Sequence, residues 1–256
     1  MKKITVLIFL TVFLILLDSI GAFAEENTTE VGEHELNDFL KNLGVPLDVI
    51  NELTYAGKFE IYNTIDSDAV FDGYSEQDVY LPEEGIGEIS PMSIPKSQLQ
   101  LKVTGFKNND GSYSIYPSFI WKQKARLRND SFGFALDSSN WSTVAGIVGL
   151  NVHMVNATAG HTDYYYYDRP STSSYAGHVF KIPTNHGTTN HLHYEGHAHF
   201  KAKPKGSKVD KRIILRYGDD TTTRGTTSYG ISIGVFSVSY PNPKGNFRQT
   251  AETLSW

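Results

Sequence analysis

Hydrophobic and polar residues alternate along much of the chain over residues 96–256, which is the pattern of β-strands with one face in a core. Leu99, Leu101 and Val103 begin this alternation. The run 108–111, Asn-Asn-Asp-Gly, predicts a hairpin turn, because these residues tolerate positive φ angles. Further predicted strands are 112–121, 125–128, 132–136, 144–155, 164–167, 175–182, 191–202, 211–217, 228–240 and 249–256. Turn-type residues separate most of them, so we predict a mostly β protein with a C-terminal antiparallel β-sandwich or barrel.

A helical period of apolar residues precedes this β region. Three short helices are predicted, around 36–43, after Pro46 and around 59–65. Residues 25–66 are therefore interpreted as a small acidic helical segment. Residues 67–95 are acidic and contain several Gly and Pro residues, so we predict a flexible or extended linker there.

The first 24 residues have the layout of a secretory signal peptide. Lys2 and Lys3 are followed by an apolar run of 14 residues, 4–17, and by the small-x-small sequence Ala22-Phe23-Ala24. An uncleaved membrane anchor is the alternative, but the run is shorter than the span of about 20 residues that a bilayer needs. We predict cleavage before Glu25 and a secreted, extracellular, bacterial protein. The chain has no cysteine, so it has neither disulfides nor a thioether-linked lipid.

The two halves of the chain carry opposite charge. Residues 25–95 contain 17 acidic and two basic residues, a net charge of −15. Residues 96–256 contain 19 basic and 10 acidic residues, a net charge of +9. One interpretation is a solvated acidic spacer beside an ordinary domain. The other is an acidic pro-region that covers a basic surface until it is removed.

Eight of the nine histidines fall between residues 153 and 199. If 191–200 is one strand, one face carries His191, His193, Glu195, His197 and His199, and the core face carries Leu192, Tyr194, Ala198 and Phe200. Neighbours on one face lie about 6.5–7 Å apart, so a His-x-His pair plus a third ligand from another strand would hold zinc. Third-ligand candidates are His153, His161, His178 and His186. The alternatives are a pH-responsive surface cluster and a merely polar, solvent-exposed face.

Four consecutive tyrosines, Tyr164, Tyr165, Tyr166 and Tyr167, suggest a second site. Exposed tyrosines stack on sugar rings and donate hydrogen bonds, so we predict a surface-binding role for them. The alternative is a strand in which two tyrosines face the core. A separate alternation over 229–235 is typical either of a long sandwich strand or of a membrane-inserting β-hairpin.

The sequence lacks the common enzyme motifs, including a Gly-x-Ser-x-Gly elbow, His-Glu-x-x-His and a phosphate-binding loop. Our leading hypothesis is a secreted, non-enzymatic protein whose basic β domain binds an anionic extracellular surface, either a cell-envelope polymer or lipid headgroups. We expect no nucleic-acid partner. The first alternative is a secreted antimicrobial or β-pore-forming protein with an acidic pro-region. The second is a metal-dependent hydrolase that uses the strand His191–His199.

Overall fold

The computed structural model describes residues 31–78, 92–93, 98–122, 129–156, 162–174, 176–183, 191–207, 209–220 and 247–256. The predicted signal peptide and the predicted strands 125–128 and 228–240 lie outside these residues. The chain divides into two compact units, Met1–Gly32 and Glu33–Trp256, and the second is described here. Within the described residues, no helix has the length and apolar character needed to cross a membrane.

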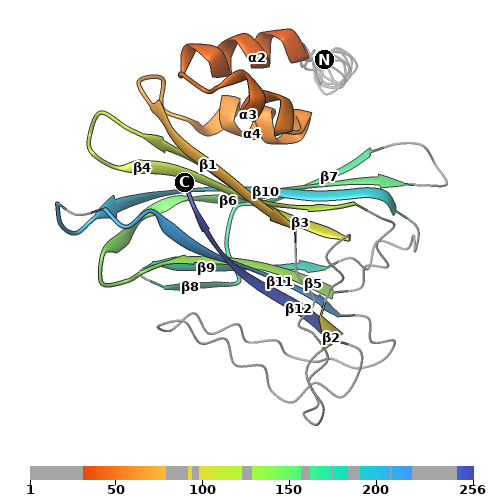
Figure 1. The fold of residues 1–256 in the computed structure, drawn as a ribbon. Coiled ribbons are helices and arrows are strands. Elements are labelled where there is room, and N and C mark those ends of the chain that lie inside the picture. The colour runs from red at the N-terminus through yellow and green to blue at the C-terminus, as the bar shows by residue number, and fades with distance from the viewer. Residues whose placement is uncertain are drawn as a thin grey trace, which may run out of the picture. The chain divides into compact units, whose positions relative to one another are not determined.

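Two six-stranded sheets form a β-sandwich, which confirms the predicted fold class (Figure 1). The order of the first sheet is β1 (Val70–Asp78), β3 (Leu99–Lys107), β4 (Tyr113–Trp121), β10 (His191–Pro204), β6 (Trp141–Asn156) and β7 (Thr162–Tyr167). The order of the second sheet is β2 (Met92–Ser93), β12 (Phe247–Ser255), β11 (Arg212–Asp220), β5 (Asn129–Leu136), β9 (Gly177–Pro183) and β8 (Thr172–Ser174). Neighbouring strands are antiparallel, except that β2 and β12 are parallel.

The alternating residues of the strands fill the space between the sheets. Leu99, Leu101 and Val103 of β3 are fully buried in this core, as their period of two predicts. The predicted hairpin between β3 and β4 is also confirmed. The Asn108 amide donates to the Ser112 carbonyl at 2.9 Å, and Gly111 has a φ of 78°, a left-handed conformation that glycine adopts without steric strain.

Three helices lie on the outer face of the first sheet. They are α2 (Glu33–Asn42), α3 (Leu47–Glu52) and α4 (Tyr55–Thr64), which confirms the predicted helical segment (Figure 1). Their apolar side chains form a second hydrophobic cluster with two aromatic residues of the sheet, Phe106 of β3 and Tyr116 of β4. The helices therefore form a packed layer of the domain.

The first part of the predicted linker is a strand. β1 pairs with β3 from Val70 to Asp78, so these residues form the edge of the first sheet. Gly73 and Gly105 face each other in this pair and make room for the C-terminal Trp256. A Cβ atom on Gly105 would lie 1.8 Å from the Trp256 ring, and one on Gly73 would lie 2.3 Å from its backbone. Close packing against Trp256 thus explains Gly73, which makes β1 look like a linker in the sequence, and Gly105 opposite it in β3.

Candidate functional site

The histidine strand has the predicted alternation but not the predicted exposure. Tyr194, Ala198 and Phe200 of β10 point into the core and are buried. On the opposite face, Glu195 and His197 are only 5% and 6% exposed. The interpretation of this face as solvent-exposed is therefore wrong for these two residues, because α4 packs on it. The side chains of His191, Leu192 and His193 lie outside the described residues.

Helix α4 approaches β10 closely at a glycine. A Cβ atom on Gly57 would lie 3.0 Å from Nδ1 of His197, so the absence of a side chain lets the helix rest on the imidazole. Thr54 caps this helix, since its hydroxyl accepts from the Gly57 amide at 3.2 Å. Nε2 of His197 lies 3.2 Å from the same hydroxyl and 3.0 Å from Oε2 of Glu195. The helix cap and the strand histidine thus form one buried polar contact.

A second histidine contact follows along the strand. Glu60 of α4 is buried, and its Oε1 lies 2.5 Å from Nδ1 of His199. Its Oε2 accepts a hydrogen bond from the side-chain amide of Asn151. His197 and His199 therefore contact different carboxylates and do not converge. No group of three His, Cys, Asp or Glu side chains suited to a metal ion occurs within the described part of the chain. The described residues therefore provide no set of side chains for the predicted zinc site, or for the hydrolase hypothesis that depends on it.

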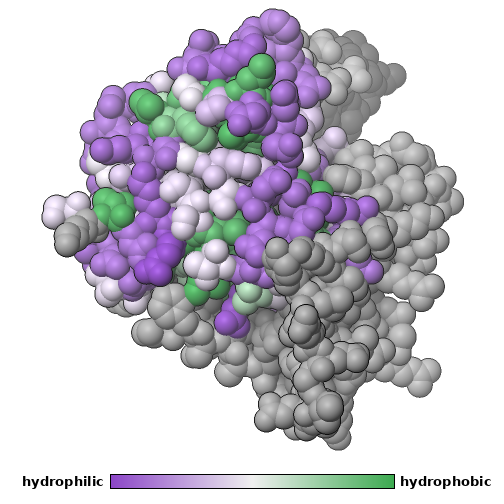
Figure 2. Space-filling model, viewed as in Figure 1, coloured by the Kyte–Doolittle hydropathy of each residue, from purple (hydrophilic) through white to green (hydrophobic). Residues whose placement is uncertain are grey.

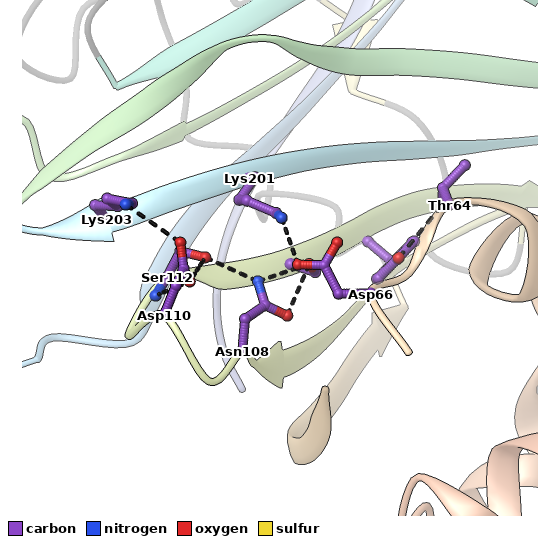
Figure 3. Close-up of polar contacts among 9 residues, drawn as sticks. Thr64, Asp66, Asn108, Asp110, Ser112, Lys201 and Lys203 are labelled. Atoms are coloured by element: carbon purple, nitrogen blue, oxygen red, sulfur yellow. Dashed lines mark hydrogen bonds and ion pairs between the residues drawn. The ribbon is translucent and has the colours of Figure 1, made fainter. Parts of the chain in front are cut away.

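Acidic residues of the region 25–95 pair with basic residues of the region 96–256. Lys102 lies 3.0 Å from Glu76, and Lys201 lies 2.5 Å from Asp66, as Figure 3 shows for the second pair. Further pairs are Lys122–Asp78 at 2.6 Å and Lys211–Asp72 at 2.7 Å. The charge asymmetry of the sequence is thus partly neutralised inside the domain. It was the one sequence signal that could have indicated these acidic partners.

The four tyrosines lie on β7, the edge strand of the first sheet next to β6. Tyr165 and Tyr167 face inward and pack against the core. Tyr164 and Tyr166 face outward and are 66% and 60% exposed. The half-buried arrangement is therefore the observed one, and it leaves two tyrosine rings on one face of the strand.

The two outward tyrosines are held by residues of β6 and β10. Tyr164 lies opposite His153 in the strand pair and touches its ring. Tyr166 lies over Gly149, where a Cβ atom would be 2.9 Å from the tyrosine hydroxyl and 2.6 Å from the His199 ring. Partial desolvation, followed by the negative charges of Glu60 and Asp168, raises the pKa of Tyr166. Its hydroxyl therefore stays protonated and keeps its hydrogen-bond donor.

Comparison with known proteins leaves the family open, because no family model and no curated protein matches the chain. Among solved structures, the collagen-binding domain of Erysipelothrix rhusiopathiae surface protein RspB has a TM-score of 0.33 and 10% identity over 60% of this chain and 45% of that one. The carbohydrate-binding module CBM28, specific for non-crystalline cellulose, has a TM-score of 0.22 and 13% identity over 49% and 80%. This chain thus spans less than half of the collagen-binding structure. These likenesses are too weak to carry a functional argument.

Proposed function

We propose that this chain is an exported, non-enzymatic binding protein whose β-sandwich engages an anionic polymer of a bacterial cell envelope. The observation that carries the proposal is the outward pair Tyr164 and Tyr166, which we call the tyrosine surface. Six large hydrophobic side chains are exposed in the described residues: Leu47, Tyr55, Val70, Ile147, Tyr164 and Tyr166. Of these, the two tyrosines follow each other along one face of one strand.

The tyrosine surface has the chemistry of a sugar-binding platform. Two same-face side chains on a strand are about 6.5–7 Å apart, so successive units of an extended polymer would meet successive rings. Tyrosine offers an apolar ring for stacking and a hydroxyl for hydrogen bonding, and only two rotatable bonds become ordered on binding. On the face in Figure 2, most described residues are hydrophilic and the hydrophobic ones form small separate areas. The described part of that face therefore offers no broad apolar surface for binding.

Charge supports an anionic partner. Arg169 is the second residue after β7, next to Asp168, and its side chain is 90% exposed. Residues 96–256 have a net charge of +9, although acidic residues of the region 25–95 pair with several of their lysines. Long-range attraction of this kind raises the rate of encounter with phosphate or carboxylate groups, while stacking on tyrosine supplies contact energy.

The antimicrobial or pore-forming alternative requires residues 25–95 to leave the sandwich. β1 completes the edge of the first sheet, and the helices share a hydrophobic cluster with Phe106 and Tyr116. Removal of this segment would expose both aromatic side chains and an edge strand. We therefore favour a binding protein that retains the segment.

The test is cosedimentation of the mature chain, residues 25–256, with isolated cell walls that carry a phosphate-containing polymer. We expect binding to walls, reduced binding after chemical removal of the polymer, and weaker binding at higher salt. Cosedimentation with vesicles that carry anionic headgroups tests the alternative that the partner is a lipid surface. Retention on vesicles together with no retention on walls would contradict the proposal.

A further inference from the structure

A cleft of about 770 Å³ is lined in part by residues 168–170, which follow the tyrosine strand β7, and both sheets contribute to its walls. β6 contributes Val144, Ala145 and Val148, and the second sheet contributes Ser173 of β8 and His178 of β9. Pro170, from the segment that joins β7 to β8, also lines it. The volume is in the range of small-molecule sites in proteins, about 300–1,000 Å³.

His178 lines this cleft and carries a buried polar atom without a hydrogen-bond partner among the described residues. His178 is 6% exposed, and its Nδ1 lies 3.1 Å from the Ser173 hydroxyl. Nε2 is buried and has no hydrogen-bond partner within the described part of the chain. The ring stands edge-on to Phe134 and close to Phe200, with centroids 5.8 Å and 6.0 Å away, so its orientation is fixed by packing. Buried polar atoms normally have a partner, so this nitrogen points to a missing one.

We propose that the cleft binds a neutral small molecule with an apolar body and a hydroxyl group, an alcohol or a phenol. The hydroxyl hydrogen-bonds with Nε2 of His178, and the apolar body packs against Val144, Val148 and Pro170. A hydroxyl group fits either tautomer of His178, because it both donates and accepts. Asp168 and Arg169, whose charged groups lie 3.9 Å apart, both line the cleft, so the pair supplies no net charge that would favour an ionic ligand.

The charge state of the histidine agrees with a neutral ligand. Burial lowers the pKa of His178 to about 4, so the imidazole is uncharged near neutral pH and attracts no anion. The site uses neither exposed tyrosine, but it shares Arg169 with the proposed polymer-binding surface.

The experiment is a titration of the mature chain with phenol and, separately, with toluene, which has the same ring but no hydroxyl group. NMR signals of the backbone amides of the cleft residues report binding in every variant, and those of the His178 imidazole add a direct report in the natural chain. We expect saturable shifts with phenol and about fivefold weaker binding of toluene, as the loss of one hydrogen bond implies. Shifts that do not saturate, or equal affinity for the two probes, would overturn the proposal.

Two variants locate the site. H178F keeps an aromatic ring among Phe134 and Phe200 but lacks Nε2, so the preference for phenol should disappear. A145W places a bulky group at an exposed position on the rim and should weaken both probes while leaving the core intact. A retained preference in folded H178F, or unchanged affinity of both probes in A145W, would contradict binding at this cleft.

Discussion

The rings of Tyr164 and His153 meet edge to face, with centroids 4.6 Å apart and planes inclined at 80°. The two residues are direct partners in the pairing of β7 with β6, so the strand ladder fixes their spacing. The exposed ring is thus supported from below by a neighbouring strand. Such a preorganised ring loses little conformational entropy when a ligand stacks on it.

The inward and outward tyrosines should respond differently to substitution. Y165A removes a ring that packs against the core, and we expect it to lower the free energy of unfolding by about 1–3 kcal/mol. Y164A removes an exposed ring and should change it by less than about 0.5 kcal/mol. Urea unfolding of both variants measures this difference. Equal losses would contradict the assignment of inner and outer faces.

Gly149 should be required for the position of Tyr166. In G149A, the new methyl group would overlap the His199 ring and the Tyr166 hydroxyl, so both side chains must move. We expect a loss of about 1–3 kcal/mol in stability, as for other overpacked sites, together with weaker polymer binding. G206A is the matched control, because no heavy atom lies within 4 Å of a Cβ at that glycine. If G149A behaves like G206A, the close packing proposed at Gly149 is wrong.

His178 should make the domain less stable in acid. Burial lowers its pKa from the ordinary value of 6.5 to about 4. Between these pH values the unfolded chain binds a proton at this residue and the folded chain does not, so acidification favours unfolding. The free energy of unfolding should fall by about 3 kcal/mol from this residue as the pH falls from about 6.5 to about 4. Unfolding free energies of H178F over this range should fall less steeply than those of the natural chain, and parallel curves would refute the assignment.

The ion pair between Asp66 and Lys201 should couple the acidic segment to the sandwich. Lys201 is largely buried and lies 2.5 Å from the Asp66 carboxylate (Figure 3). A double-mutant cycle with D66N and K201M should give a coupling energy of about 1 kcal/mol. The exposed pair Asp38–Lys41 is the control, and its coupling should be at most a few tenths of a kcal/mol. A coupling for Asp66–Lys201 no larger than that of the control would show that this pair does not stabilise the contact.

The local patterns of the sequence predict most of the strands and all three helices. Alternation identifies β3, β4 and β10, and the Asn-Asn-Asp-Gly run identifies the hairpin, because these signals depend only on nearby residues. The sequence does not predict β1, because Gly73 and several acidic residues interrupt its pattern. Its glycine is explained only by Trp256, which lies far away in the sequence.

The environment of the histidine strand could not be predicted in the same way. The alternation of residues along β10 correctly divides its side chains between two faces, but it does not predict what covers the second face. That depends on α4, which packs there through Gly57 and Glu60. The cleft at His178 likewise depends on residues from both sheets, which only the tertiary fold brings together.

The most direct test of the proposed function is the affinity of the mature chain for a soluble, phosphate-containing envelope polymer, measured by titration calorimetry. The double variant Y164A/Y166A should bind at least tenfold more weakly, since truncation of an aromatic residue that anchors a ligand costs about 1 kcal/mol or more. V70A is the matched control, because Val70 is an exposed apolar residue on the opposite edge strand of the same sheet, and it should bind like the natural chain. Undiminished affinity of a folded Y164A/Y166A protein would contradict binding at the tyrosine surface.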